Sequence, residues 1–110
     1  MTVKEVFELR RQGHIEEAYN AILPRYRVHH GKYTSLAMFW CAADMMNLLL
    51  SRALDTTETS LFSLQEAEKI YLSLQRLCSK IPDESGACRQ TMLNLGESLK
   101  ATRLRVMDTK

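Results

Sequence analysis

The chain has 110 residues, of which 45% are hydrophobic and 25% are charged. This length and composition are typical of one globular domain with an ordinary core, and they exclude an intrinsically disordered chain. Its 15 basic and 13 acidic residues leave a formal charge of +2, which is too even to indicate a nucleic-acid or membrane partner by itself.

Two short helices are predicted at the start of the chain. Thr2 is followed three residues later by Glu5, a capping-box pattern that opens a helix, and Gly13 is suited to the left-handed turn that ends it. A second helix should begin directly after this turn. Because Pro24 lacks a backbone donor and crowds the preceding turn, we expect a kink or break near Leu23.

A third, central helix is predicted over residues 34–54. From residue 36 onward nearly every position is apolar, and the polar exceptions Asp44, Asn47 and Ser51 recur at helical spacing. Such a helix must be buried on most sides and exposes one thin polar stripe. Its longest unbroken apolar run, residues 36–43, is far too short to span a bilayer.

The last two helices follow a polar loop at residues 55–60. Ser63 with Glu66 forms a second capping-box pattern, and Pro82 should end the helix that this pattern opens. The final helix is predicted over residues 85–105. Since no stretch alternates with the period of a strand, the fold is predicted to be all-α, with about five helices packed as antiparallel neighbours.

The three cysteines, Cys41, Cys78 and Cys88, each lie within a helical pattern and form no CxxC pair. This arrangement is typical of reduced, buried cysteines and favours a cytoplasmic protein over a disulfide framework or a zinc site. The first eleven residues begin an amphipathic helix rather than an export signal. Adjacent histidines at 29 and 30 diverge by about 100° on a helix, so no metal site is predicted.

No catalytic role is predicted for this chain. The sequence contains no glycine-rich phosphate loop, carboxylate pair or triad signature, and the cysteines lie on apolar faces where a thiol stays protonated. We therefore expect no enzyme activity and no cofactor.

One alternative is nucleic-acid binding by the basic segment 25–32. Its charged or titratable side chains would contact phosphates, and tyrosines interleaved with them would stack on bases. The residues concerned are Arg25, Arg27, His29, His30 and Lys32, with Tyr26 and Tyr33 between or beside them. A solvated turn explains the same segment without any partner.

Two parts of the chain resemble tetratricopeptide repeats. Residues 12–22 are similar to the turn and second-helix start of such a repeat, where Gly13 makes the tight turn and the small Ala18 lets two helices approach closely. The first-helix signature is echoed twice, and Ala67 with Tyr71 resembles a second helix. The two echoes are Phe39, Ala42, Ala43 and Met46, and Met92, Leu95, Gly96 and Leu99. Residues 31–44 are also similar to small bacterial repeat-like proteins.

The resemblance implies a right-handed array of antiparallel helical hairpins with a C-terminal capping helix. It departs from the family in the loop at 55–60, which lengthens the repeat beyond about 34 residues, and in the position of Pro24. In the family the first helices of successive hairpins line a concave surface that binds a peptide or partner protein. The matching positions here are Arg10, Arg11, Trp40, Asp44, Asn47, Gln90, Glu97 and Lys100.

Self-association is the other alternative. The sequence has six methionines, including the adjacent Met45 and Met46, and an almost wholly apolar central helix. Five short helices offer limited apolar surface to cover that helix, so a second copy could bury part of it as a homodimer.

Overall fold

A computed structural model describes residues 2–55, 60–83 and 85–108, which form five α-helices without any strand. The all-α prediction is therefore confirmed. The helices are α1 (Val3–Arg11), α2 (Ile15–Val28), α3 (Lys32–Asp55), α4 (Ser60–Cys78) and α5 (Ala87–Asp108). None of these described helices is long and apolar enough to cross a membrane.

Helix α1 has the ends that the sequence predicts. The backbone N–H of Glu5 donates to the hydroxyl of Thr2 at 3.2 Å, which satisfies one donor of the first turn. At the other end Gly13 has a φ of +86°, and the backbone N–H groups of Gly13 and His14 donate to the carbonyls of Arg10 and Leu9. This pair of hydrogen bonds is a Schellman motif, and it turns the chain sharply into α2.

Helix α2 continues through Pro24 to Val28, so of the kink or break predicted near Leu23 the break does not occur. Pro24 removes the donor that the carbonyl of Asn20 would receive in a regular helix. Both Asn20 and Pro24 are exposed, so water can hydrate that carbonyl without burying an unsatisfied polar group.

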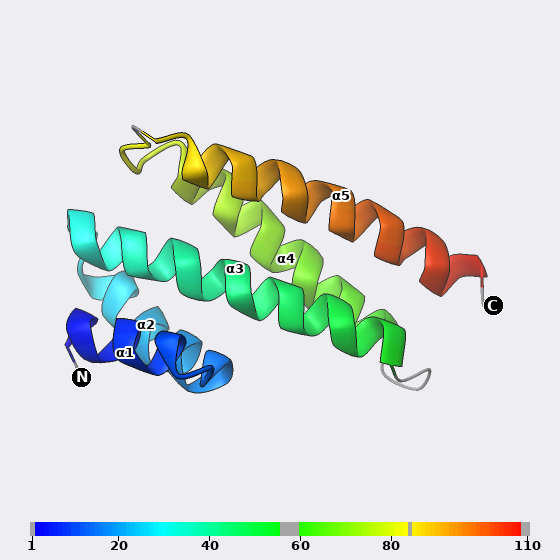
Figure 1. Ribbon diagram of the computed structural model, residues 1–110, viewed down its shortest axis with the longest axis horizontal. Coiled ribbons are helices and arrows are strands. Elements are labelled where there is room, and N and C mark those ends of the chain that lie inside the picture. Colours follow the sequence, from blue (N-terminus) through cyan, green and yellow to red (C-terminus); the bar gives the residue numbers. More distant parts are fainter. Residues whose placement is uncertain (1, 56–59, 84, 109–110) are drawn as a thin grey trace.

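Helix α3 is the centre of the fold, since it contacts all four other helices. Helices α1 and α2 lie on one side of it, and α4 and α5 lie on the other (Figure 1). Half of its 24 residues are buried, including Phe39 and Met46. Alanines at 37, 42, 43 and 53 are also buried and let the neighbouring helices approach closely.

The predicted polar stripe of α3 faces outward, as expected. Asn47 and Ser51 are exposed and Asp44 is half-buried. Within the described chain, therefore, the second half of the stripe faces solvent and not the core.

Helix α4 begins one turn earlier than predicted. Its buried face includes Ser60, Ser63 and Leu64 as well as the later apolar positions, so the helical period already starts at Ser60. Ser63 lies inside the helix, and the predicted capping box at Ser63 and Glu66 is wrong. Residues 56–59 of the predicted loop, and residue 84 of the turn before α5, lie outside the described residues.

Helix α5 begins two residues later than predicted and is capped by a carboxylate from the preceding turn. The backbone N–H groups of Cys88 and Arg89 donate to the two oxygens of Asp83, each at 3.0 Å. These two hydrogen bonds hold the pKa of Asp83 below its ordinary value. Asp83 thus fixes where α5 starts relative to the end of α4.

Candidate functional site

Three of the predicted surface residues come together between α1 and α3. The Nε of Arg10 lies 2.5 Å from Oδ2 of Asp44, and the Arg10 guanidinium lies 5.4 Å from the centre of the Trp40 ring. Trp40 in turn meets the Phe39 ring edge to face at 5.1 Å. The Arg10 side chain is therefore held by the Asp44 carboxylate and by the face of the Trp40 ring. The charge of Asp44 is thus paired within the molecule.

The other five predicted surface residues do not join this cluster. Arg11 pairs with Glu8 on its own helix, and Asn47 is exposed on α3. Gln90 donates to Asn94 of its own helix at 3.1 Å. Gln90, Glu97 and Lys100 are exposed on α5, which contacts α3 and α4 but not α1.

The predicted basic segment spans the end of α2 and the start of α3, and its charged side chains are exposed. Tyr26 stacks on His30 at a ring separation of 4.6 Å, and the Nζ of Lys32 lies 5.8 Å from the centre of the Tyr33 ring. Of the five predicted phosphate contacts, Arg27 lines one hollow of the surface and Lys32 lines another.

The cysteines are free thiols with raised pKa values. Burial, followed by the charge of Asp44, raises the pKa of Cys41 to about 11, and burial with the charge of Asp83 raises the pKa of Cys88 to about 11. Burial also raises the pKa of the half-buried Cys78. Among residues 2–55, 60–83 and 85–108, no three His, Cys, Asp or Glu side chains are grouped so as to hold a metal ion.

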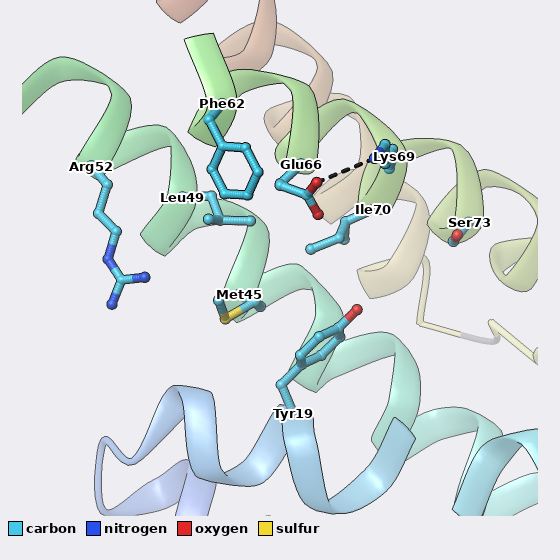
Figure 2. A pocket seen from close by; sticks show the side chains of 9 residues that line it. All are labelled: Tyr19, Met45, Leu49, Arg52, Phe62, Glu66, Lys69, Ile70 and Ser73. Carbon is cyan, nitrogen blue, oxygen red and sulfur yellow. Dashed lines mark hydrogen bonds and ion pairs between the residues drawn. The ribbon is translucent and has the colours of Figure 1, made fainter. Parts of the chain in front are cut away.

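Another hollow lies between α2 and α4. Its volume is about 370 Å³, and Figure 2 shows Met45, Leu49 and Ile70 between Tyr19 of α2 and Phe62 of α4. Helices α2 and α4 both contact α3 but do not contact each other. The side chains of α3 therefore form the floor of this hollow, while α2 and α4 form its walls.

A second hollow of about 340 Å³ continues the first toward the C-terminal ends of α2 and α4. Tyr19, Ile70 and Ser73 line both hollows, so the two make one continuous groove. We call it the α2–α4 groove. From Phe62 to Arg76 it follows α4 for 14 residues, which corresponds to about 20 Å or four turns of helix. The apolar residues that the second hollow adds are Leu23, Tyr26, Met38, Ala42, Leu74 and Leu77.

The two ends of the groove differ in charge. At the first end the charged lining residues are paired, Lys69 with Glu66 at 3.2 Å and Arg52 with Glu16 of α2. The second end is lined by Arg27, Arg76 and Lys80 and by no acidic residue. No carboxylate of the described residues forms an ion pair with any of these three cations.

Tyr19 stands at the junction of the two hollows. Burial raises the pKa of its phenol, with Arg27 opposing this shift and Glu66 adding to it. The Tyr19 hydroxyl is therefore a neutral donor at physiological pH, placed between a basic and a mixed-charge part of the groove.

Sequence reasoning missed this groove as a site. Ile70 and Leu74 follow the apolar period of α4 and were expected to form core, and Met45 was expected in the core or in a homodimer seam. Phe62 was expected near a solvated loop, yet it lies within α4 with 64% of its surface exposed. The only signal in the sequence was that Arg76 and Lys80 follow one another at helical spacing beside an apolar face.

Comparison of this chain with protein-family models, with curated proteins and with solved structures found no match. The geometry of the chain itself therefore carries the functional argument.

Proposed function

We propose that this protein is an interaction module that binds a helical segment of a partner protein in the α2–α4 groove. The segment has an apolar face about four turns long and acidic residues at its C-terminal end. The observation that carries the proposal is a continuous apolar groove whose one end holds three cations that no carboxylate of the described residues pairs with.

The apolar lining supports a helical occupant. A groove about 20 Å long with walls of helix and a floor of methionine and leucine suits the apolar face of an amphipathic helix. Met38 and Met45 contribute flexible side chains that adapt to differing partner residues. Phe62 and Tyr19 add the large aromatic surfaces that usually dominate binding energy at interfaces.

The charge of the second end supports an acidic terminus on the partner. Arg27, Arg76 and Lys80 would attract carboxylates, and the C-terminal end of a helix adds negative potential of its own. The paired charges at the first end offer no comparable attraction. The groove thereby favours one direction of the bound helix.

A tetratricopeptide-like array is part of the proposal. The succession of contacts from α1 to α3 and from α3 to α5, with none between α2 and α4, supports it. The binding surface that the resemblance implied lies instead around Arg10, Trp40 and Asp44. Because Asp44 and Arg10 already satisfy one another there, the α2–α4 groove is the better candidate.

We infer no catalysis by this module. The pKa values of about 11 at Cys41 and Cys88 keep both thiols protonated at neutral pH, which argues against a cysteine nucleophile.

The test uses a fluorescein-labelled peptide of 18 residues with leucines on one helical face and three glutamates at its C-terminal end. A matched peptide carries three lysines in place of the glutamates. Fluorescence anisotropy should show the glutamate peptide binding at least about tenfold more tightly than the lysine peptide at low salt.

Two variants separate the apolar and charged contributions. Phe62→Ala should weaken both peptides, since Phe62 is exposed and its loss does not disturb the core. The double variant Arg76→Glu with Lys80→Glu should reverse the preference, whereas Lys4→Glu, on the exposed face of α1, should leave it unchanged. Equal binding of either peptide to the wild type and to Phe62→Ala would contradict the proposal.

A second candidate function is nucleic-acid association through the basic segment. One observation favours it: the Tyr33 ring is 67% exposed beside the Nζ of Lys32 and offers a face on which a base could stack. Anisotropy with a labelled single-stranded 20-mer in low salt tests it. Binding that falls with salt and is lost in Tyr33→Ala would favour nucleic acid over the peptide.

A further inference from the structure

Six exposed residues form a stripe along the outer face of α5. They are Gln90, Leu93, Glu97, Lys100, Leu104 and Met107, and we call them the α5 stripe. Their spacing alternates between three and four residues, which is the a and d spacing of a coiled coil. Leu93, Leu104 and Met107 are 62%, 59% and 53% exposed, so apolar side chains lie at both ends of the stripe.

The α5 stripe points directly away from its own molecule. Cys88, Leu95 and Thr102, at the position of the heptad opposite to a and d, are all buried against the rest of the domain. Helix α5 contacts only α3 and α4, and it lies along one edge of the fold (Figure 1). The stripe is therefore open to a second helix along its length, and Lys100 at its centre also lines a hollow beside Tyr71 and Leu72 of α4.

The composition of the stripe does not suit a helix face that only contacts water. A helix face that no neighbour covers is usually polar. Here the outer face of α5 carries two leucines and a methionine instead. These side chains indicate a partner surface.

We propose that the partner is a second copy of this chain, whose α5 packs antiparallel against the first across a two-fold axis. If the two-fold axis passes between residues 98 and 99, each stripe residue of one copy faces a stripe residue of the other copy. Leu93 then meets Leu104 of the second copy, and Glu97 meets Lys100. Gln90 meets Met107, which completes the same a-to-d pairing.

Charge selects this orientation. In the antiparallel pair, both central layers join a carboxylate to an ammonium group, flanked by a leucine layer on each side. In a parallel pair, Glu97 would face Glu97 and Lys100 would face Lys100, which places like charges together at the centre of the seam. The charges of the two α5 stripes are thus complementary only when the two helices run antiparallel.

The dimer leaves the proposed peptide site open. No residue of the α5 stripe lines the α2–α4 groove, and α5 does not contact α2. The two proposals can therefore fail independently.

Sedimentation equilibrium over about 1–300 μM tests the proposal. The wild type should form a monomer–dimer equilibrium within this range, because two leucine layers and one pair of charge layers make a small interface. Glu97→Lys and Lys100→Glu should each raise the dimer dissociation constant at least about tenfold, since each places like charges in both central layers.

Two further measurements test the charge pairing of the central layers. The charge-swapped double variant Glu97→Lys with Lys100→Glu should dimerise as the wild type does. An equimolar mixture of the two single variants should also recover dimer, because both central layers then join opposite charges. A parallel seam predicts instead that each single variant dimerises about as tightly as the wild type, because all three would have two like-charge layers. It also predicts that the mixture dimerises more tightly than the wild type, because only the mixed dimer would then join opposite charges.

Circular dichroism should show that these exposed substitutions leave the helical fold intact. Phe62→Ala serves as the matched control, because it changes the groove and should not alter dimerisation. A wild type that stays monomeric at 300 μM, or single variants that dimerise as tightly as the wild type, would overturn the proposal.

Discussion

The hydroxyl of Tyr71 lies 2.7 Å from the point that a β-carbon on residue 96 would occupy. Helices α4 and α5 therefore approach closely at this place because residue 96 is glycine. The next atom, Cζ of the same ring, is 3.5 Å away, which is an ordinary contact distance. The steric conflict with any larger residue thus comes from one oxygen atom.

Gly96→Ala should destabilise the protein by about 1 kcal/mol despite the better helix propensity of alanine, because overpacking outweighs that gain. In a Tyr71→Phe background the same substitution should stabilise by about 0.5–1 kcal/mol, since the blocking oxygen is gone. Urea denaturation followed by circular dichroism measures both. Stabilisation by Gly96→Ala in the presence of Tyr71 would show that the ring moves aside freely.

The ion pair between Arg10 and Asp44 should contribute about 1 kcal/mol in a double-mutant cycle to alanine, near the upper end for pairs that water still reaches. Only 24% of the Asp44 side chain is exposed. Because Trp40 is the only tryptophan, Arg10→Ala should also shift the fluorescence emission to longer wavelength by uncovering its ring. Arg11→Ala is the control and should leave the emission unchanged.

Pro24→Ala should stabilise the protein by about 2 kcal/mol. The substitution restores the hydrogen bond to the carbonyl of Asn20 within a continuous helix, and the more flexible unfolded chain offsets only part of this gain. Thermal and urea unfolding measure the change. Pro82→Ala, outside any described helix, should give no such gain, and equal effects at both sites would contradict this account.

Asp83 should make the stability of the protein depend on pH in the acidic range. Its folded pKa is lowered by the N–H groups of Cys88 and Arg89, so the stabilisation is complete above the ordinary aspartate pKa of about 3.9. It is then lost as the pH falls through the lowered folded value. The difference in unfolding free energy between wild type and Asp83→Ala should therefore be largest near pH 6 and should decrease as the pH falls below the ordinary aspartate range. Asp55→Ala provides a comparison at another exposed carboxylate.

The thiols should react slowly in the folded protein. With a pKa of about 11, roughly one thiol in a thousand is ionised at pH 8, and Cys41 and Cys88 are also buried. Iodoacetamide at pH 8 should modify the half-buried Cys78 before the other two, as mass spectrometry of peptides would reveal. In urea all three should react alike, and rapid modification of folded Cys41 would contradict its burial.

The helices were predictable because each satisfies its own local signals. Periodic apolar residues marked all five helices, and Thr2 and Gly13 fixed the ends of α1. The start of α4 was missed because Ser63 and Glu66 match a capping-box pattern, whereas Ser60 and Ser63 are both buried residues within the helix. The helix break at Pro24 was predicted wrongly because the effect of this proline depends on whether water can reach the carbonyl of Asn20. That access is set by the tertiary structure.

The groove could not be predicted in the same way. Sequence periodicity identifies which face of a helix is apolar but not which helix will cover it. Ile70 looked like core from its sequence period, yet it lines a groove with Tyr19 and Met45 because α2 and α4 pack on α3 and have no backbone contact with each other. Similarly, nothing local linked Arg10 to Asp44, which is 34 residues away.

Helix α3 belongs to two helix groups at once, one with α1 and α2 and the other with α4 and α5, and the two groups share no further contact. In native-state hydrogen exchange, α1 and α2 should therefore open as a separate unit while α3, α4 and α5 remain protected. That opening removes one wall of the α2–α4 groove. A partner helix that contacts both walls would slow the exchange of the amide hydrogens in α2. Binding would therefore be detected as protection of a helix at the opposite side of the fold from α5.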